Sequence, residues 1–233
     1  MQTNRVISVF GDSILKGVRL LSGTTRYGTT DEIGLESIAK QHDWTILNRS
    51  RFGCTVQKGE QLLNRQLEKG DVPDAVLLEY GGNDADFRWA EIAERPFDEH
   101  QPNTPLPCFI ETLRRMVGTL RAHHVTPILS TLPPILSERY LDWITRSGLS
   151  KENILAWLGD ANAIYRYQEK YSLAIERLAR ELDCRLIDLR SAFLEKRSLL
   201  PYLCDDGIHP NDAGQKLIHE TLSAAANASP SLI

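Results

Sequence analysis

A serine near the start of the chain and an aspartate–histidine pair near its end have the side-chain types of a catalytic triad. Ser13 follows Gly11-Asp12, and Asp206 precedes His209 by three residues. A serine hydroxyl is a poor nucleophile at neutral pH unless a neighbouring base takes its proton. An imidazole can be that base. Because triads depend on geometry and not on chain order, these segments predict nucleophilic chemistry if they meet in space.

The aspartate and two further segments complete the expected chemistry. In a turn, the Asp206 carboxylate and the His209 imidazole can lie on the same side. The carboxylate would then hold the neutral tautomer of the ring and stabilise the imidazolium that forms. An acyl transition state also needs hydrogen-bond donors for its oxyanion. The candidates are the backbone amides of Ser13 and Gly53 and the side chain of Asn83.

Short apolar segments with the length of buried strands must position these residues. Strands are predicted at 5–10, 44–48, 75–80, 127–132 and 185–189. Between them, apolar residues recur every three or four positions, as on one face of a helix, within 56–67, 109–120, 171–182 and 217–225. Alternating strands and helices predict parallel βαβ units and therefore an open α/β sheet with helices on both faces.

The candidate residues follow the ends of the predicted strands. Ser13 comes after the first strand, Gly53 after the second, Asn83 after the third, and Asp206 and His209 beyond the fifth. In open parallel sheets, ligands bind outside the carboxyl ends of the strands, where the loops gather. We therefore expect these residues to converge at one edge of the sheet.

Four sequence blocks resemble, in order, those of the SGNH (GDSL) hydrolases. They are Gly11-Asp12-Ser13-Ile14, the isolated Gly53, Gly81-Gly82-Asn83-Asp84 and Asp206-Gly207-Ile208-His209-Pro210-Asn211. Together they span 11–211, nearly the whole chain. One departure is Ile14, which stands where the name motif has leucine, an apolar residue in place of another.

This resemblance implies a fold and an activity. The fold is three-layer α/β/α with a five-stranded parallel sheet of flavodoxin-like order 2-1-3-4-5. The activity is ester hydrolysis through an acyl-enzyme, without a cofactor. The resemblance casts Ser13 as nucleophile, His209 as base and Asp206 as its partner, with Gly53 and Asn83 in the oxyanion hole. The partner is then a small-molecule ester.

Length, charge and cysteine usage narrow the class of protein. The 233 residues contain no linker, so one domain is expected over 1–233. A formal charge of −4 without a basic block argues against nucleic acid or an anionic membrane as partner. The early apolar run at 6–10 is too short for a signal peptide or a membrane span. The four cysteines form no Cys-x-x-Cys pair, which predicts free thiols and a cytoplasmic location.

Two long connections, 84–107 and 133–165, leave the same edge of the predicted sheet. Loops of this length are uncommon unless they are functional. The second has helically spaced apolar residues and is expected to contain short helices. Both carry aromatic residues, among which we expect Trp89 and Trp143 to shape the substrate site.

Each candidate also has a simpler interpretation. Ser13 could cap a helix after the first strand. The pair of Asp206 and His209 could be structural, and Gly53 and Asn83 could be ordinary turn residues. The carboxylates at 84, 86, 205 and 206 could suggest a metal site, but the chain has no phosphate-binding loop, so no metal is expected. Asp12 and Asp84 are expected to hold their turns through backbone hydrogen bonds.

Several functions remain open on this scaffold. The leading one is a serine esterase for small carboxylic esters, with acetylated sugars preferred because no long apolar stretch suggests a lipid-facing surface. The alternatives are an acyltransferase, a thioesterase or a lysophospholipase. A non-catalytic binding module ranks last, because the serine, histidine and asparagine are all present.

Overall fold

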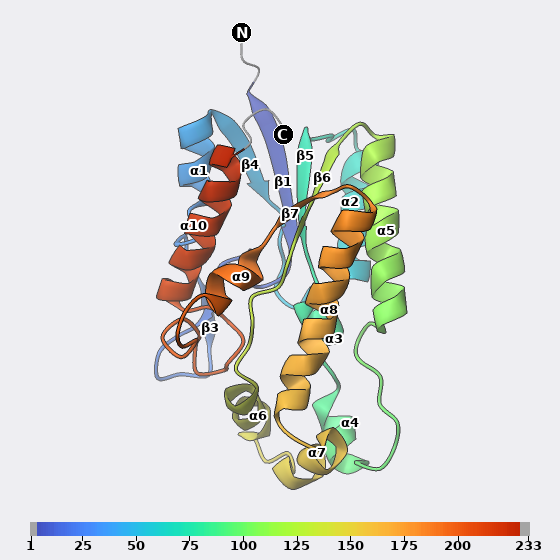
Figure 1. The fold of residues 1–233 in the computed structure, drawn as a ribbon, viewed down its shortest axis with the longest axis vertical. Coiled ribbons are helices and arrows are strands. Elements are labelled where there is room, and N and C mark those ends of the chain that lie inside the picture. Colours follow the sequence, from blue (N-terminus) through green and yellow to red (C-terminus); the bar gives the residue numbers. More distant parts are fainter. Residues whose placement is uncertain (1–3, 229–233) are drawn as a thin grey trace.

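A five-stranded parallel sheet forms the centre of the protein in the computed structural model, which describes residues 4–228 (Figure 1). Its strands lie in the order β4 (Trp44–Asn48), β1 (Arg5–Gly11), β5 (Ala75–Glu79), β6 (Thr126–Ser130) and β7 (Arg185–Ile187). All neighbouring strands pair in parallel. Counted along the chain among these five strands, the order is 2-1-3-4-5, which confirms the predicted fold class and topology.

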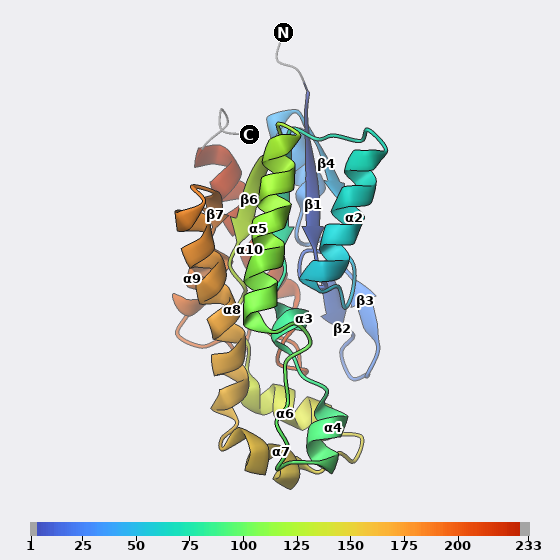
Figure 2. The same ribbon diagram turned by 90° about the vertical axis from the view of Figure 1, so that its right-hand side faces the viewer.

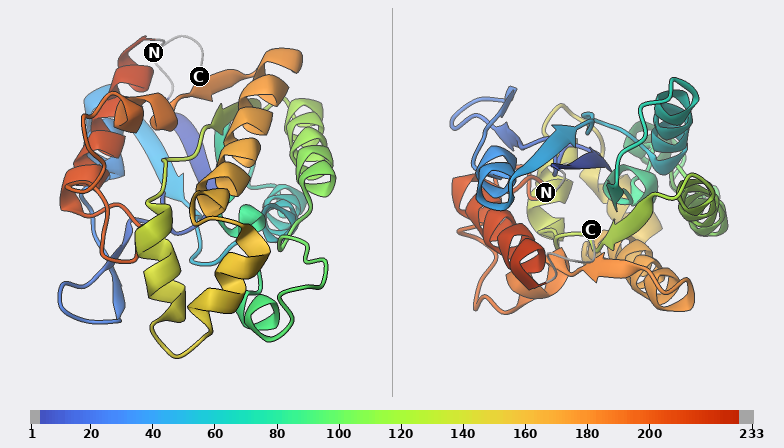
Figure 3. Two further views of the ribbon diagram at one scale, coloured as in Figure 1. Left: turned by 60° about the horizontal axis from the view of Figure 1, so that its bottom comes forward. Right: turned by 90° about the horizontal axis from the view of Figure 1, so that it is seen from above.

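Helices cover both faces of the sheet. Because successive side chains of a strand point to opposite sides, Phe10 of β1 packs on one face, and Ile7 and Val9 pack on the other. The first face is covered by α2 (Val56–Glu68), α5 (Leu106–Ala122) and α8 (Asn162–Glu181). The second is covered by α1 (Leu35–His42), α9 (Leu189–Leu194) and α10 (Asp212–Ala228). Figures 2 and 3 show these layers from the side and from above.

Four shorter helices lie in the connections that follow β5 and β6. They are α3 (Gly82–Ala85), α4 (Trp89–Glu94), α6 (Ser137–Thr145) and α7 (Lys151–Leu158). We call α4, α6 and α7 the cap, because they lie beyond the carboxyl ends of the strands, at the bottom of Figure 1. The cap has its own apolar cluster, which includes Ile92, Leu141, Ile154 and, from α8, Ile164. The short helices expected in 133–165 are therefore present, and 84–107 contains α4 as well.

One region differs from the sequence prediction. After β1 the chain forms no helix that Ser13 could cap. It turns, with the Val18 amide donating to the Ser13 carbonyl at 2.9 Å. It then enters an antiparallel hairpin of β2 (Val18–Leu20) and β3 (Tyr27–Thr29). The hairpin and α1 escaped prediction because strands of three residues and a helix of eight carry too little periodicity to be recognised.

Candidate active site

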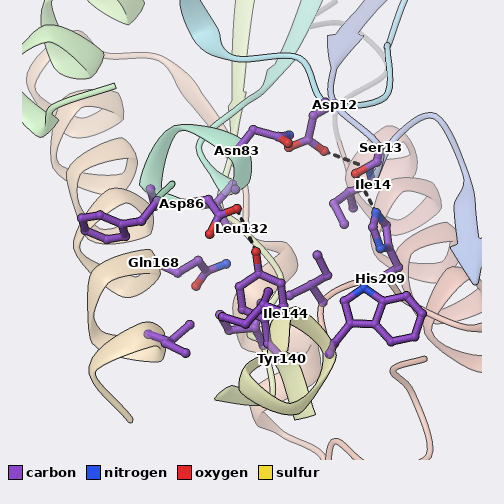
Figure 4. Close-up of a pocket in the computed structure, with 18 of the residues that line it drawn as sticks. Asp12, Ser13, Ile14, Asn83, Asp86, Leu132, Tyr140, Ile144, Gln168 and His209 are labelled. Carbon is purple, nitrogen blue, oxygen red and sulfur yellow. Dashed lines mark hydrogen bonds between the residues drawn. The ribbon is translucent and has the colours of Figure 1, made fainter. Parts of the chain in front are cut away.

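Ser13, His209 and Asp206 form one hydrogen-bonded chain at the carboxyl edge of the sheet, of which Figure 4 shows Ser13 and His209. The Nε2 atom of His209 lies 2.9 Å from the Ser13 hydroxyl oxygen. Its Nδ1 atom lies 2.6 Å from Oδ2 of Asp206. All three side chains are buried, and Asp206 is completely inaccessible. Two segments far apart in the chain thus meet, in the order carboxylate, imidazole and hydroxyl.

The loop that carries Asp206 keeps its side chain ionised. Its Oδ1 atom accepts hydrogen bonds from the backbone amides of Ile208 and His209, both at 3.0 Å. Burial alone would raise the pKa of Asp206. The His209 side chain, through its hydrogen bond and its charge, opposes this effect, as do the two backbone amides. The pKa of Asp206 is therefore below its ordinary value. Asp206 is therefore an acceptor that keeps the proton of His209 on Nδ1.

The turn that carries Ser13 is held by the residue before it. The Oδ1 atom of Asp12 accepts a hydrogen bond from the Ile14 amide at 2.8 Å, and its Oδ2 atom accepts one from Nδ2 of Asn83 at 3.0 Å. Asp12 is therefore a turn-holding residue, as the sequence analysis expects. It also links this turn to Asn83 of α3, and both side chains are labelled in the upper part of Figure 4.

The three residues expected to carry the oxyanion donors, Ser13, Gly53 and Asn83, line the same cavity. Within residues 4–228, neither the Ser13 amide nor the Gly53 amide donates a hydrogen bond, and both residues line a cavity. Gly53 has a φ of 67°, a conformation that residues with a side chain rarely adopt. Besides its hydrogen bond to Asp12, Nδ2 of Asn83 makes only a long contact of 3.4 Å with the Cys54 carbonyl. The second N–H of this amide is therefore weakly held and can turn to another acceptor.

A cavity of about 410 Å³ opens beside the triad. This volume falls in the range of roughly 300–1,000 Å³ that is usual for small-molecule sites. In Figure 4, Ser13 and His209 lie at one side of the cavity, and Asp86 and Gln168 lie toward the other. Most of its wall is apolar and comes from the connections that follow β5 and β6 and from α8, including Ala85, Phe87, Leu132, Ile135, Ile144, Leu149 and Ile164.

The two tryptophans that the sequence analysis singled out both line this cavity. Trp89 is buried, and its indole N–H donates to Oδ1 of Asp86 at 2.8 Å. The Tyr140 hydroxyl donates to the other oxygen of Asp86, also at 2.8 Å. Burial raises the pKa of Asp86 above its ordinary value. The aromatic residues of the two connections are therefore partly cavity wall, and Asp86 ties α4 to α6 beneath it.

Tyr27, Phe52 and Trp143 form an aromatic rim at the mouth of the cavity, and of these three the sequence analysis singled out only Trp143. The Tyr27 ring lies 5.0 Å from the His209 ring and 5.3 Å from the Phe52 ring. Phe52 stacks on His209 with an interplanar angle of 10°. Tyr27 comes from the unpredicted hairpin, and no motif marks Phe52 except its place before Gly53. The Arg146 guanidinium covers the Trp143 ring at 3.7 Å.

Two of the carboxylates that could have suggested a metal site have hydrogen-bond partners within the protein. Asp86 accepts from Trp89 and Tyr140, and Asp206 accepts from His209. Over the described range 4–228, no three His, Cys, Asp or Glu residues are grouped to hold a metal ion. In the same part of the chain, no helix has the length and apolarity to cross a bilayer.

Comparisons with known proteins agree with this geometry. The model of the GDSL-like Lipase/Acylhydrolase family matches residues 9–217. Thioesterase 1/protease 1/lysophospholipase L1 of Escherichia coli is 26% identical over 218 residues, covering 92% of this chain and 80% of that protein. The isoamyl acetate-hydrolyzing esterase of Saccharomyces cerevisiae is 30% identical over 124 residues, which cover 52% of this chain and 47% of that protein.

Solved structures support the fold. The lipase/acylhydrolase of Enterococcus faecalis superposes with a TM-score of 0.68 at 20% identity, covering 96% of each chain. An acetylxylan esterase of Geobacillus stearothermophilus superposes with a TM-score of 0.62 at 19% identity, covering 95% of this chain and 94% of that one. With the family match over most of its length, this chain belongs to the GDSL-like lipase/acylhydrolase (SGNH hydrolase) family and is a carboxylic ester hydrolase.

Proposed function

We propose that the chain hydrolyses small carboxylic esters through an acyl-enzyme formed on Ser13. The Ser13 oxygen attacks the ester carbonyl carbon while His209 takes the hydroxyl proton. The tetrahedral intermediate then expels the alcohol, which leaves with that proton. Water next attacks the acyl-enzyme with His209 again as base, which releases the acid and restores Ser13. The observation that carries this proposal is the unbroken chain of hydrogen bonds from Asp206 through His209 to Ser13.

The donors around Ser13 support this mechanism. In each tetrahedral intermediate, negative charge develops on the former carbonyl oxygen. The Ser13 and Gly53 amides, which line the cavity, and the Asn83 side chain would stabilise that charge. Asp206 stays ionised and stabilises the imidazolium of His209 during both steps.

The first test replaces Ser13. Ser13→Ala should lower kcat on a p-nitrophenyl ester by roughly a millionfold and abolish labelling by a fluorophosphonate. Ser223→Ala is the matched control, because the Ser223 hydroxyl also lies near an imidazole, at 3.5 Å from Nε2 of His219. Substantial turnover by Ser13→Ala, or a comparable loss in Ser223→Ala, would exclude Ser13 as nucleophile.

The cavity supports an ester with an apolar acyl group. Its wall is mainly aliphatic and aromatic, and the polar side chains within it are largely engaged by the protein. The Gln168 amide donates to the Pro133 carbonyl and accepts from Arg190, and Asp86 is bonded to Trp89 and Tyr140. An acetylated sugar, the preference from sequence alone, would use little of this apolar volume and would find few free partners for its hydroxyls.

A second candidate is a thioesterase for apolar acyl groups. It is favoured by the same cavity and by the similarity to a thioesterase/lysophospholipase. A series of p-nitrophenyl esters from acetate to palmitate, together with an acetylated sugar and the matching acyl thioesters, distinguishes these substrates. The apolar cavity leads us to expect kcat/KM to rise beyond acetate. A maximum at acetate with efficient deacetylation of sugars would instead favour the carbohydrate esterase, and product analysis with added alcohols would detect acyl transfer.

A further inference from the structure

Glu79 has a fully buried carboxyl group directly beside the turn that carries Ser13. It is the last residue of β5 and pairs in register with Gly11 of β1. Its Oε2 atom lies 3.4 Å from the backbone nitrogen of Asp12. A Cβ atom on residue 11 would lie 2.9 Å from the same oxygen. The glycine of the Gly-Asp-Ser segment is therefore required because Glu79 occupies the space beside it.

The Asp12 carboxylate links the turn that carries Ser13 to the Asn83 side chain. Asp12 is only 1% exposed and holds the Ile14 amide with one oxygen and the Asn83 side chain with the other. The orientation of Asn83 therefore depends on where the Asp12 carboxylate lies. A residue that fixes the position of the Asp12 carboxylate therefore also fixes the orientation of the Asn83 amide.

Glu79 and Asp12 are both buried and adjacent, and two neighbouring carboxyl groups out of solvent strongly disfavour the state in which both are ionised. Burial and the neighbouring Asp12 carboxylate raise the pKa of Glu79 well above its ordinary value. Burial also raises the pKa of Asp12, but the amides of Ile14 and Asn83 and the nearby His209 stabilise its charge and oppose that rise. The other titratable groups around the pair are Cys54, Tyr80 and Asp84, none of which brings a positive charge. The proton therefore resides on Glu79.

We propose that Glu79, as a neutral carboxylic acid, is a positioning residue that donates a hydrogen bond to the Asp12 carboxylate and so holds Asn83 toward the oxyanion. The proposal rests on the proposed role of Asn83 in ester hydrolysis. An ionised Glu79 would repel Asp12 and disturb its hydrogen bonds with Ile14 and Asn83. Glu79 would then affect the transition state without touching the substrate.

The first experiment compares Glu79→Gln with Glu79→Met on p-nitrophenyl acetate. Glutamine keeps a neutral donor of the same length, whereas methionine removes it. Glu79→Met should lower kcat by roughly 10–100-fold with KM changed little, because the loss of a complete oxyanion donor costs roughly 10²–10³. Glu79→Gln should recover most of that loss. Equal kcat values for Glu79→Met and wild type, or equal losses in both variants, would overturn the proposal.

The pH profile provides a readout that needs no methionine variant. In the wild type, ionisation of Glu79 should lower kcat toward alkaline pH. Glu79→Gln has no proton to lose there, so its kcat should decline less over the same range. Thermal unfolding is measured at each pH to show that both proteins remain folded. If their kcat profiles then superimpose at alkaline pH, the protonation of Glu79 has no effect on kcat and the proposal is wrong.

A double-mutant cycle separates this role from general damage to the fold. If Glu79 acts through Asn83, Glu79→Met should cost much less in kcat when Asn83 is already alanine. Losses that multiply would contradict the proposed route. Fluorophosphonate labelling of Ser13 is measured on every variant, so a failure of the positioning role is distinguished from a failure of Ser13 as nucleophile.

Discussion

Both carboxylate oxygens of Asp84 lie 3.1 Å from the backbone nitrogen of Val56, the first residue of α2. Thr55, at the N-cap position, makes no side-chain cap of its own. Asp84 thus satisfies a free amide at the helix N-terminus from another segment of the chain. Because it adjoins Asn83, and Val56 lies just beyond Gly53, this contact also links the two segments that carry the proposed oxyanion donors.

The first prediction concerns the pH dependence of this contact. Burial raises the pKa of Asp84 from 3.8 to about 7. The folded protein then binds a proton that the unfolded chain has released, so stability decreases as the pH rises across this range. Asp84→Asn lacks this titration. Denaturant unfolding should show the free energy of unfolding of the wild type falling relative to Asp84→Asn between about pH 4 and pH 7. A relative rise would contradict the prediction.

The second prediction concerns the left-handed backbone at Gly53. A Cβ atom there would meet no atom within 4 Å, so alanine introduces backbone strain without a clash. Gly70 has the same property, with a φ of 78°, and lies at the far end of α2. Gly53→Ala and Gly70→Ala should each cost about 1–2 kcal/mol of stability. Only Gly53→Ala should also lower kcat, and equal kcat values in the two variants would argue against Gly53 as an oxyanion donor.

The third prediction separates Asp206 from its exposed neighbour Asp205. Asp206→Asn preserves size but presents a donor or a weaker acceptor to His209, which favours the wrong tautomer. By analogy with other triads, kcat should fall by roughly 10⁴-fold, whereas Asp205→Asn should change it little. Steady-state kinetics on one p-nitrophenyl ester measures both variants. Similar kcat values for the two would remove Asp206 from the mechanism.

The fourth prediction concerns the link between α4 and α6. Tyr140→Phe removes one of the two side-chain donors to the buried Asp86 and should cost about 1–3 kcal/mol. Tyr165→Phe is the control, since Tyr165 lies under Arg190 and outside the cavity wall. Thermal unfolding and the acyl-length profile should change in Tyr140→Phe alone. An unaltered melting temperature would mean that Asp86 keeps its stability with Trp89 as its only partner.

The fifth prediction concerns the aromatic rim. Phe52 is 53% exposed yet stacks on His209, whereas Phe97 is 93% exposed and has no aromatic neighbour in the described part of the chain. Phe52→Ala should raise KM for esters of bulky alcohols by a few-fold, because it removes apolar contact area at the mouth. Phe97→Ala should leave KM unchanged. A change of KM that depends on acyl length instead would place the acyl group, and not the alcohol, against the rim.

Local sequence patterns determined the sheet and the catalytic segments. The strands around Ile7, Ile46, Leu77 and Ile128 are short apolar runs bounded by turn residues, which is the pattern of strands buried on both faces. The positions of Ser13, Gly53, Asn83 and His209 after strand ends followed from that pattern, because the carboxyl ends of parallel strands share one edge.

Tertiary structure alone decided the surroundings of these residues. In the sequence, nothing distinguishes Glu79 from other residues at the end of a strand, and Tyr27 is an isolated aromatic residue. Their positions beside Asp12 and His209 depend on strand register and on a hairpin fold, which involve residues far apart in the chain. Periodicity reports only which face of its own element a side chain occupies. The cavity shape and the buried carboxyl pair arise from packing between elements, which no local pattern encodes.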